Sequence, residues 1–148
     1  MPKLDLSSIP QINRTTYPDE YADKVQQRWF RRLAPVAGIT DFGASHVVLK
    51  PGGWSAQRHW HEEEDELVIM LSGEAVLIDD NGRTPMRAGD IAAFPKGDGN
   101  GHCLVNESEQ DCSFVAIGGG AEGDCHYPDI DLHLFRGKGF RRKDGTEF

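Results

Sequence analysis

The sequence has few cysteines and no long apolar run. Its three cysteines, Cys103, Cys112 and Cys125, are odd in number and lack CxxC spacing, so neither a disulfide framework nor a cysteine-based zinc site is indicated. We interpret them as small buried hydrophobic residues. No stretch approaches the roughly 18 apolar residues of a membrane span, and residues 1–18 lack the regions of a secretory signal. We therefore expect a cytoplasmic protein with no membrane partner.

Positive charge is scarce as well. The 148 residues carry a formal net charge of -8, which argues against a nucleic-acid partner, because proteins that bind nucleic acids present a basic face. Residues 136–148 depart from this balance, since lysine and arginine outnumber the acids there. Such a tail either binds an anion or a partner, or is solvated and partly disordered, because glycine and charge both oppose packing.

The apolar residues that are present suffice for one domain with a single core, at 38% of the chain. From Tyr17 to Leu33 an apolar residue recurs at every fourth position, at Tyr21, Val25, Trp29 and Leu33. Pro18 suits the start of a helix and Pro35 its end, so this segment predicts one short helix. This helix would belong to an N-terminal arm, residues 1–41, that precedes a barrel, residues 42–135, and the basic tail, residues 136–148.

From residue 42 onward, short β-branched or aromatic segments alternate with glycine and proline. We expect about eight strands, in SHVVLK, QRHWH, ELVIML, EAVLID, DIAAFP, HCLVN, CSFVAIG and DIDLHLF. No helical spacer separates these segments. They therefore predict an all-β fold, an antiparallel sandwich or barrel.

Histidines and acids gather in RHWHEEEDELVIML. His59 and His61 are two residues apart, so a strand would project both side chains from one face, whereas a helix would separate them by about 200 degrees. Glu66 begins the next strand, which can return its carboxylate to the two imidazoles, and His102 opens a later strand. Three nitrogen donors and one carboxylate suit a divalent transition metal. The alternative is a pair of surface histidines beside a solvated acidic turn.

The spacing around these residues favours the metal site. Gly53, His59, His61, Glu66 and Gly73 form the pattern G(X)5HXH(X)4E(X)6G. This pattern resembles the first motif of the cupin superfamily.

A second stretch, GDIAAFPKGDGNGHCLVN, resembles the second cupin motif, with Gly89, Pro95, His102 and Asn106 in place. It departs from that motif by two extra residues between Pro95 and His102, within the turn-forming DGNG. The insertion leaves open whether His102 reaches the ion.

The resemblance implies a small antiparallel β-barrel, the cupin jelly roll, with a metal inside near one end and His59, His61, Glu66 and His102 as its ligands. Iron or manganese is favoured on family grounds, while zinc, nickel, cobalt and copper suit the same ligands. The resemblance also implies a homodimer. Trp29 and Phe30 either contribute to that interface or cap the barrel of their own chain.

Four protein ligands leave two positions of a six-coordinate ion open to water, dioxygen or a small oxygen-rich substrate. One hypothesis is an enzyme, dioxygenase or isomerase-like, that performs oxygenation, isomerisation or lyase chemistry. The resemblance extends to a bacterial cupin subgroup sometimes labelled sugar-phosphate isomerases. The other hypothesis is a non-catalytic module that binds or senses a small ligand.

The sequence singles out no catalytic residue. Three residues are candidates for the cavity wall because of the strand faces they would share: Gln57 with His59, and Val68 and Met70 with Glu66. Ordinary core packing is the alternative for Val68 and Met70.

Overall fold

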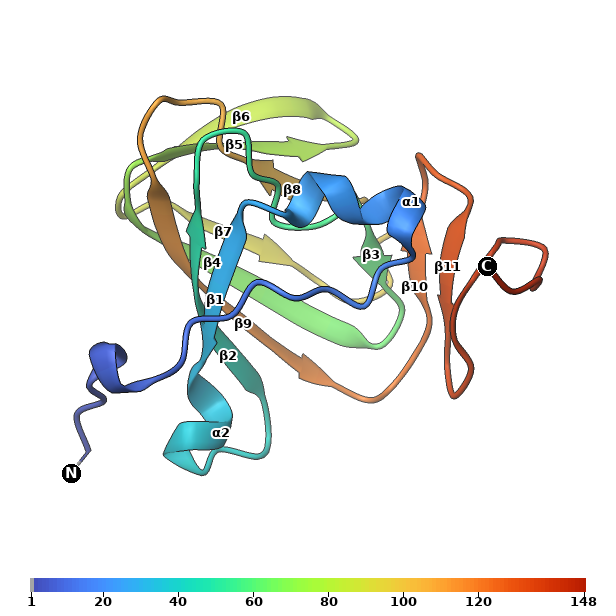
Figure 1. Cartoon of the computed structure of the whole chain (residues 1–148). Helices are drawn as coiled ribbons and strands as arrows, with labels where there is room; N and C mark the ends of the chain where they lie inside the picture. The colour runs from blue at the N-terminus through green and yellow to red at the C-terminus, as the bar shows by residue number, and fades with distance from the viewer. Residues whose placement is uncertain (1) are drawn as a thin grey trace.

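Strands make up most of the fold, and they lie where β-branched and aromatic segments alternate with glycine and proline (Figure 1). The computed structural model describes residues 2–148. Within these residues the strands are β1 (Arg28–Arg32), β2 (Gly43–Leu49), β3 (Trp60–His61), β4 (Glu64–Ser72), β5 (Glu74–Asp79), β6 (Gly82–Arg87), β7 (Ile91–Phe94), β8 (Cys103–Val105), β9 (Cys112–Gly120), β10 (Cys125–Tyr127), β11 (Leu132–Phe135) and β12 (Gly139–Arg141).

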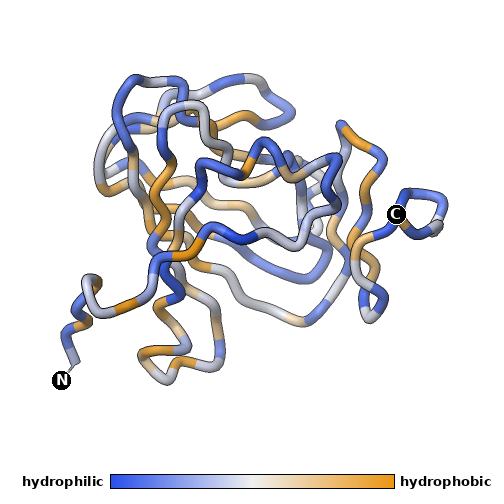
Figure 2. The backbone as a smooth tube through the Cα atoms, in the orientation of Figure 1, coloured by the Kyte–Doolittle hydropathy of each residue, from blue (hydrophilic) through white to orange (hydrophobic). Residues whose placement is uncertain are grey.

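The strands form antiparallel sheets of five, four and three strands, in the orders β1-β2-β9-β4-β7, β12-β11-β10-β3 and β6-β5-β8. The five-stranded and three-stranded sheets pack their inner faces together, so the main core lies between them. Figure 2 shows the apolar residues concentrated on these strands and the polar residues in the connecting loops. The expected all-β barrel is confirmed. The core residues are Val47, Leu49, Val68, Met70, Ala75, Met86, Ala92, Phe94, Leu104, Cys112 and Phe114.

The N-terminal region contains the expected short helix, but the predicted extent from Tyr17 to Leu33 is wrong. Helix α1 (Asp19–Ala22) is followed by a 3-10 turn (Asp23–Val25), and residues 28–32 form β1, which pairs with β2. A four-residue apolar spacing over so short a segment fits a strand as well as a helix, and the free edge of β2 decides the outcome by supplying backbone hydrogen bonds. Pro35 lies within the first turn of a second helix, α2 (Leu33–Ala37), where no backbone donor is needed.

Because residues 28–32 form a strand, the two adjacent aromatic residues of β1 project from opposite faces. Phe30 packs against the core of its own chain, while Trp29 occupies the opposite face, paired in register with Val48. The homodimer stays a prediction.

None of the helices among residues 2–148 has the length and hydropathy of a transmembrane span.

The basic tail is more ordered than its composition indicates. Residues 139–141 form β12, which pairs with β11, and Phe140 packs against Tyr17 and Tyr127. The expectation of a disordered end is wrong for this part of the tail, because one aromatic residue among the charges finds apolar partners. Strand β6 was also unforeseen, since it contains Pro85, which an edge strand tolerates.

Candidate metal centre

Backbone pairing brings the two halves of the candidate site together. His59 and His102 face each other in an isolated bridge, with a hydrogen bond from each N–H to the other carbonyl at 3.1 and 2.9 Å. His61 lies in β3, and Glu66 lies near the start of β4. The insertion before His102 therefore does not remove it from the group, because the bridge to His59 sets its position.

The Nε2 atoms of all three imidazoles face the Glu66 carboxylate. His102 Nε2 lies 2.7 Å and His59 Nε2 lies 3.6 Å from Oε2, while His61 Nε2 lies 3.2 Å from Oε1. The ligand atoms of His59, Glu66 and His102 all lie within 4.8 Å of one another. The structure thus brings together the four side chains that the sequence spacing selected.

The chemistry of this donor set fits a divalent transition ion. His59 Nδ1 lies 2.8 Å from the carbonyl oxygen of Gln57, so Nδ1 carries the proton and Nε2 keeps a lone pair directed at the site. Lone pairs and a carboxylate repel one another unless a proton or a cation lies between them. Three imidazole nitrogens and one carboxylate oxygen can hold such a cation, and this nitrogen-rich set suits a transition metal.

The electrostatics prepare Glu66 as an anionic ligand. Burial opposes its charge, but the three imidazoles beside it, first His102 and then His59 and His61, outweigh burial and hold the pKa of Glu66 far below its usual range. Burial also lowers the pKa of His102. For His61, burial is outweighed by hydrogen bonds with Cys125 and Glu66, which raise its pKa to about 10. His61 must therefore release a proton when an ion binds.

Comparison with known proteins agrees with the fold and the site. The model of the Cupin domain family matches residues 45–118, half of the chain. A sugar phosphate isomerase of the cupin superfamily from Silicibacter pomeroyi is 39% identical, with a TM-score of 0.94 over 99% of this chain and 96% of that chain. The chain belongs to the cupin superfamily.

Two other similar proteins cover less of the chain. The oxalate-binding protein of Thermotoga maritima is 34% identical over 67 residues, which span 45% of this cupin and 54% of that relative's length. The chain therefore spans about half of that relative. A Cupin 2 conserved barrel domain protein from Salinispora arenicola is 27% identical, with a TM-score of 0.59 over 82% of this chain and 88% of that chain.

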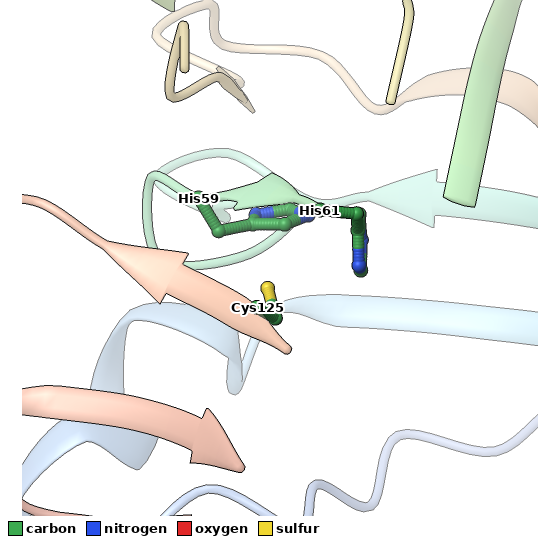
Figure 3. Close-up of side chains that lie close together, drawn as sticks. All are labelled: His59, His61 and Cys125. Carbon is green, nitrogen blue, oxygen red and sulfur yellow. The ribbon is translucent and has the colours of Figure 1, made fainter. Parts of the chain in front are cut away.

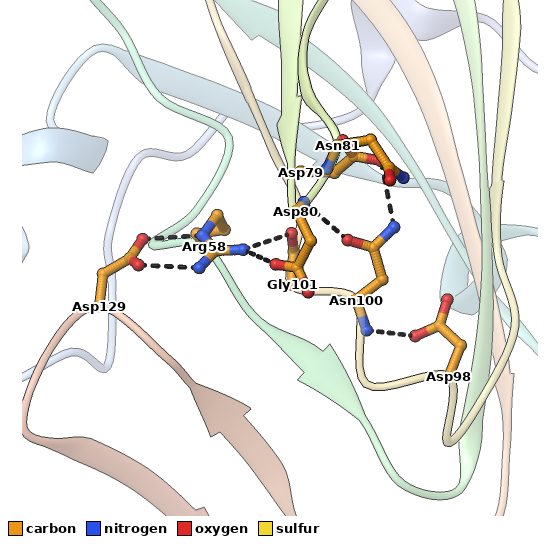
Figure 4. A network of polar contacts seen from close by, with 8 residues as sticks. All are labelled: Arg58, Asp79, Asp80, Asn81, Asp98, Asn100, Gly101 and Asp129. Carbon is orange, nitrogen blue, oxygen red and sulfur yellow. Dashed lines mark hydrogen bonds and ion pairs between the residues drawn. The ribbon is translucent and has the colours of Figure 1, made fainter.

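The two extra residues of the second cupin motif are fastened to the neighbouring turn (Figure 4). The Asn100 side chain accepts a hydrogen bond from the Asp80 backbone N–H at 2.8 Å and donates to Asp79 at 3.1 Å. The Asn100 backbone N–H donates to Asp98 at 3.0 Å. These bonds fix the inserted segment against the turn at Asp79 and Asp80.

Arg58 holds the other side of this loop. Its Nη1 donates to the carbonyl oxygen of Gly101 at 3.1 Å and pairs with Asp80, while Nε and Nη2 each donate to Asp129 at 2.8 Å. Arg58 alternates with the histidines along its segment and points away from the site, as the strand periodicity predicts. It anchors the residue directly before His102.

One potential donor, Cys125, was missed in the sequence. Its sulfur and ligand atoms of His59 and His61 lie within 4.8 Å of one another (Figure 3). Cys125 faces His61 in the register of β10 with β3, and it is 1% exposed. The short strand β10 gave no clear sequence pattern, so the pairing that brings the thiol to the histidines could not be foreseen.

Replacing Cys125 with serine is expected to leave about one divalent ion per chain, because three imidazoles and one carboxylate already complete the donor set. The measurement is elemental analysis of the purified variant and the native chain. A variant without its ion, but still folded by circular dichroism, would make the thiolate a ligand.

The four candidate ligands lie on the wall of a cavity of about 450 Å³, a volume suited to a small molecule. Of the three wall candidates, Val68 lines the cavity. Gln57 and Met70 do not line it. Gln57 instead donates from Nε2 to the carbonyl oxygen of Tyr21 at 3.0 Å and holds His59 through its own carbonyl, and Met70 lies in the core.

Proposed function

We propose that this cupin is a metal-dependent enzyme that acts on a small oxygen-rich molecule by isomerisation, lyase or oxygen chemistry. His59, His61, His102 and Glu66 hold the ion in this proposal, with iron or manganese favoured among the divalent transition metals. The observation that carries it is the convergence of three Nε2 atoms on one carboxylate at the wall of a small-molecule cavity.

A divalent ion in this position supplies Lewis-acid polarisation of a substrate oxygen. The chain supplies groups around it. Burial raises the pKa values of Tyr17 and Tyr127, so both phenols stay neutral and serve as hydrogen-bond donors on the cavity wall. Glu64 lines the cavity outside the proposed ligand set, with a carboxylate oxygen 3.7 Å from His61 Nδ1. It is the carboxylate placed to accept a proton from a bound substrate.

Polarity favours an enzyme over an inert scaffold. A cavity that only stabilised the barrel would be filled by apolar side chains, whereas this one is open enough for a ligand and combines carboxylate, phenol and imidazole groups. The 39% identical relative named a sugar phosphate isomerase supports a substrate with adjacent hydroxyl and carbonyl oxygens. The second candidate, a cupin that binds a small ligand without reaction, is supported by the similarity to an oxalate-binding protein.

Elemental analysis of protein purified without chelator tests the proposal. We expect about one divalent transition metal per chain. Iron would favour oxygen chemistry, and manganese or zinc would favour isomerase or lyase chemistry. The loaded protein is then incubated with hydroxy-aldehydes, hydroxy-ketones and their phosphates, and products are followed by NMR. Turnover that chelation stops and added metal restores supports the enzyme; binding without turnover supports the second candidate, and absence of metal contradicts the site.

A further inference from the structure

A buried arginine on the cavity wall has an unused hydrogen-bonding edge. Arg28 comes from β1, whose inward residues Arg28, Phe30 and Arg32 line the cavity. Its Nη1 donates to the carbonyl oxygen of Ser55 at 2.8 Å. Its Nε is buried and has no hydrogen-bond partner among residues 2–148. A buried donor without an acceptor is costly, so this position calls for an explanation.

Arg58 shows how the Nε and Nη2 edge of an arginine binds an anion elsewhere in the same molecule. Its Nε and Nη2 donate in parallel to the two carboxylate oxygens of Asp129, each at 2.8 Å. In Arg28 the bond to Ser55 uses Nη1, and therefore leaves the edge formed by Nε and Nη2. The planar spacing of this edge matches two oxygens of a carboxylate or phosphate.

The charges of the cavity wall also favour an anionic ligand beside Arg28. The charged residues of its wall are Arg28, Arg32, Glu64 and Glu66, apart from the histidines. Glu66 is already shared among three imidazoles, so its charge does not neutralise Arg28. Burial lowers the pKa of Arg28, because its cation has lost water without gaining a carboxylate. An oxyanion in the cavity would restore both the missing charge and the missing acceptor.

We propose that Arg28 is the anion-binding residue of the cavity, and that the ligand is a small molecule bearing a carboxylate or a phosphate. The Nε and Nη2 atoms hold two oxygens of that group, while the remainder of the molecule extends toward His59 and Glu66. This assignment rests on the proposed function for the role of the metal, but the oxyanion contact itself needs only Arg28.

Titration calorimetry with malonate, inorganic phosphate and glycerol tests the assignment on manganese-loaded and on chelator-treated protein. We expect malonate or phosphate to bind the native chain and glycerol not to bind. Arg28→Gln should weaken the binding of that anion about tenfold or more, because it removes a charge-assisted pair of hydrogen bonds. Stronger binding of malonate assigns a carboxylate, and stronger binding of phosphate assigns a phosphate.

Arg31→Gln is the matched control. Arg31 lies on the same strand with its side chain on the opposite face, where Nε donates to the carbonyl oxygen of Ile9. The Arg31→Gln substitution removes the same charge as Arg28→Gln, and it should leave anion affinity unchanged. Arg28→Lys keeps the charge but lacks the two-point edge, so it should recover only part of the affinity. Thermal melting verifies that each variant is folded.

Several results would overturn the assignment. The first two are equal anion affinity in the native chain and Arg28→Gln, and failure of both anions to bind the native chain. The other two are a loss of anion affinity in Arg31→Gln equal to that in Arg28→Gln, and full native affinity in Arg28→Lys. Metal content is measured on every sample. A native chain without metal that still binds an anion through Arg28 contradicts the proposed function alone, whereas a loaded chain in which Arg28→Gln changes nothing contradicts the anion site alone.

Discussion

Replacing Glu66 with alanine is expected to empty the metal centre. Three imidazole nitrogens converge on this one carboxylate, and their proximity holds its pKa far below its usual range, so it stays ionised. Groups outside a coordination sphere already change metal affinity about 10- to 100-fold, so loss of this ligand should lower affinity by at least about 100-fold. His59→Ala should act in the same way. The bond from Nδ1 of His59 to the carbonyl oxygen of Gln57 leaves the Nε2 lone pair available to bind the ion.

Elemental analysis after dialysis measures the effect, and two variants serve as controls. Glu74→Ala removes an exposed acid that pairs with Arg87, and His46→Ala removes a histidine of β2 outside the cavity lining. Both should keep their metal. If Glu66→Ala and His59→Ala retain as much metal as these controls, the ion is not held by the group described above.

The convergence of the first three candidate side chains could be predicted from the sequence because their geometry is local. Two residues that alternate on a strand and an acid at the start of the next strand converge whenever those strands pair. Most strand positions between residues 43 and 135, though not those of β6 and β10, were predicted for the same reason, since β-branched runs between turns are a local pattern. His102 needed tertiary information, because only its bridge to His59 shows that the longer loop still delivers it.

The remaining site residues were missed for two physical reasons. Arg28 lies in a segment whose apolar spacing predicted a helix, and a helix gave no reason to place this side chain in the cavity; pairing with β2 reverses that interpretation. Cys125 depends on the pairing of β10 with β3, two short strands distant in sequence. Sequence patterns report local periodicity, whereas strand pairing over such a separation is decided by the whole core.

Replacing Asn106 with alanine is expected to lower the free energy of unfolding by about 3–5 kcal/mol, among the largest effects of any single substitution in the core. Asn106 is 0% exposed. Its Nδ2 donates to the carbonyl oxygens of Leu49 and Gln110 at 2.8 and 2.7 Å, and its Oδ1 accepts from the backbone N–H and the hydroxyl of Ser108 at 2.9 and 2.7 Å. Truncation removes all four bonds and leaves the buried carbonyl oxygen of Leu49 without this donor.

Urea unfolding compares Asn106→Ala with two other variants. Asn106→Asp keeps the shape but turns a carboxylate toward two carbonyl oxygens, so it should destabilise at least as much at neutral pH. Asn81→Ala removes an exposed turn amide and should change stability by less than about 0.5 kcal/mol. If Asn106→Ala unfolds within that same margin of the native chain, the four bonds of the Asn106 side chain contribute nothing to stability.

The loss should extend to the metal centre. Asn106 directly follows β8, and His102 directly precedes it, so the three-residue strand between them links the buried amide to a candidate ligand. Loosening one end of so short a strand weakens the bridge that holds His102 opposite His59. In Asn106→Ala protein that is still folded, metal affinity should therefore fall together with stability, whereas Asn81→Ala should change neither.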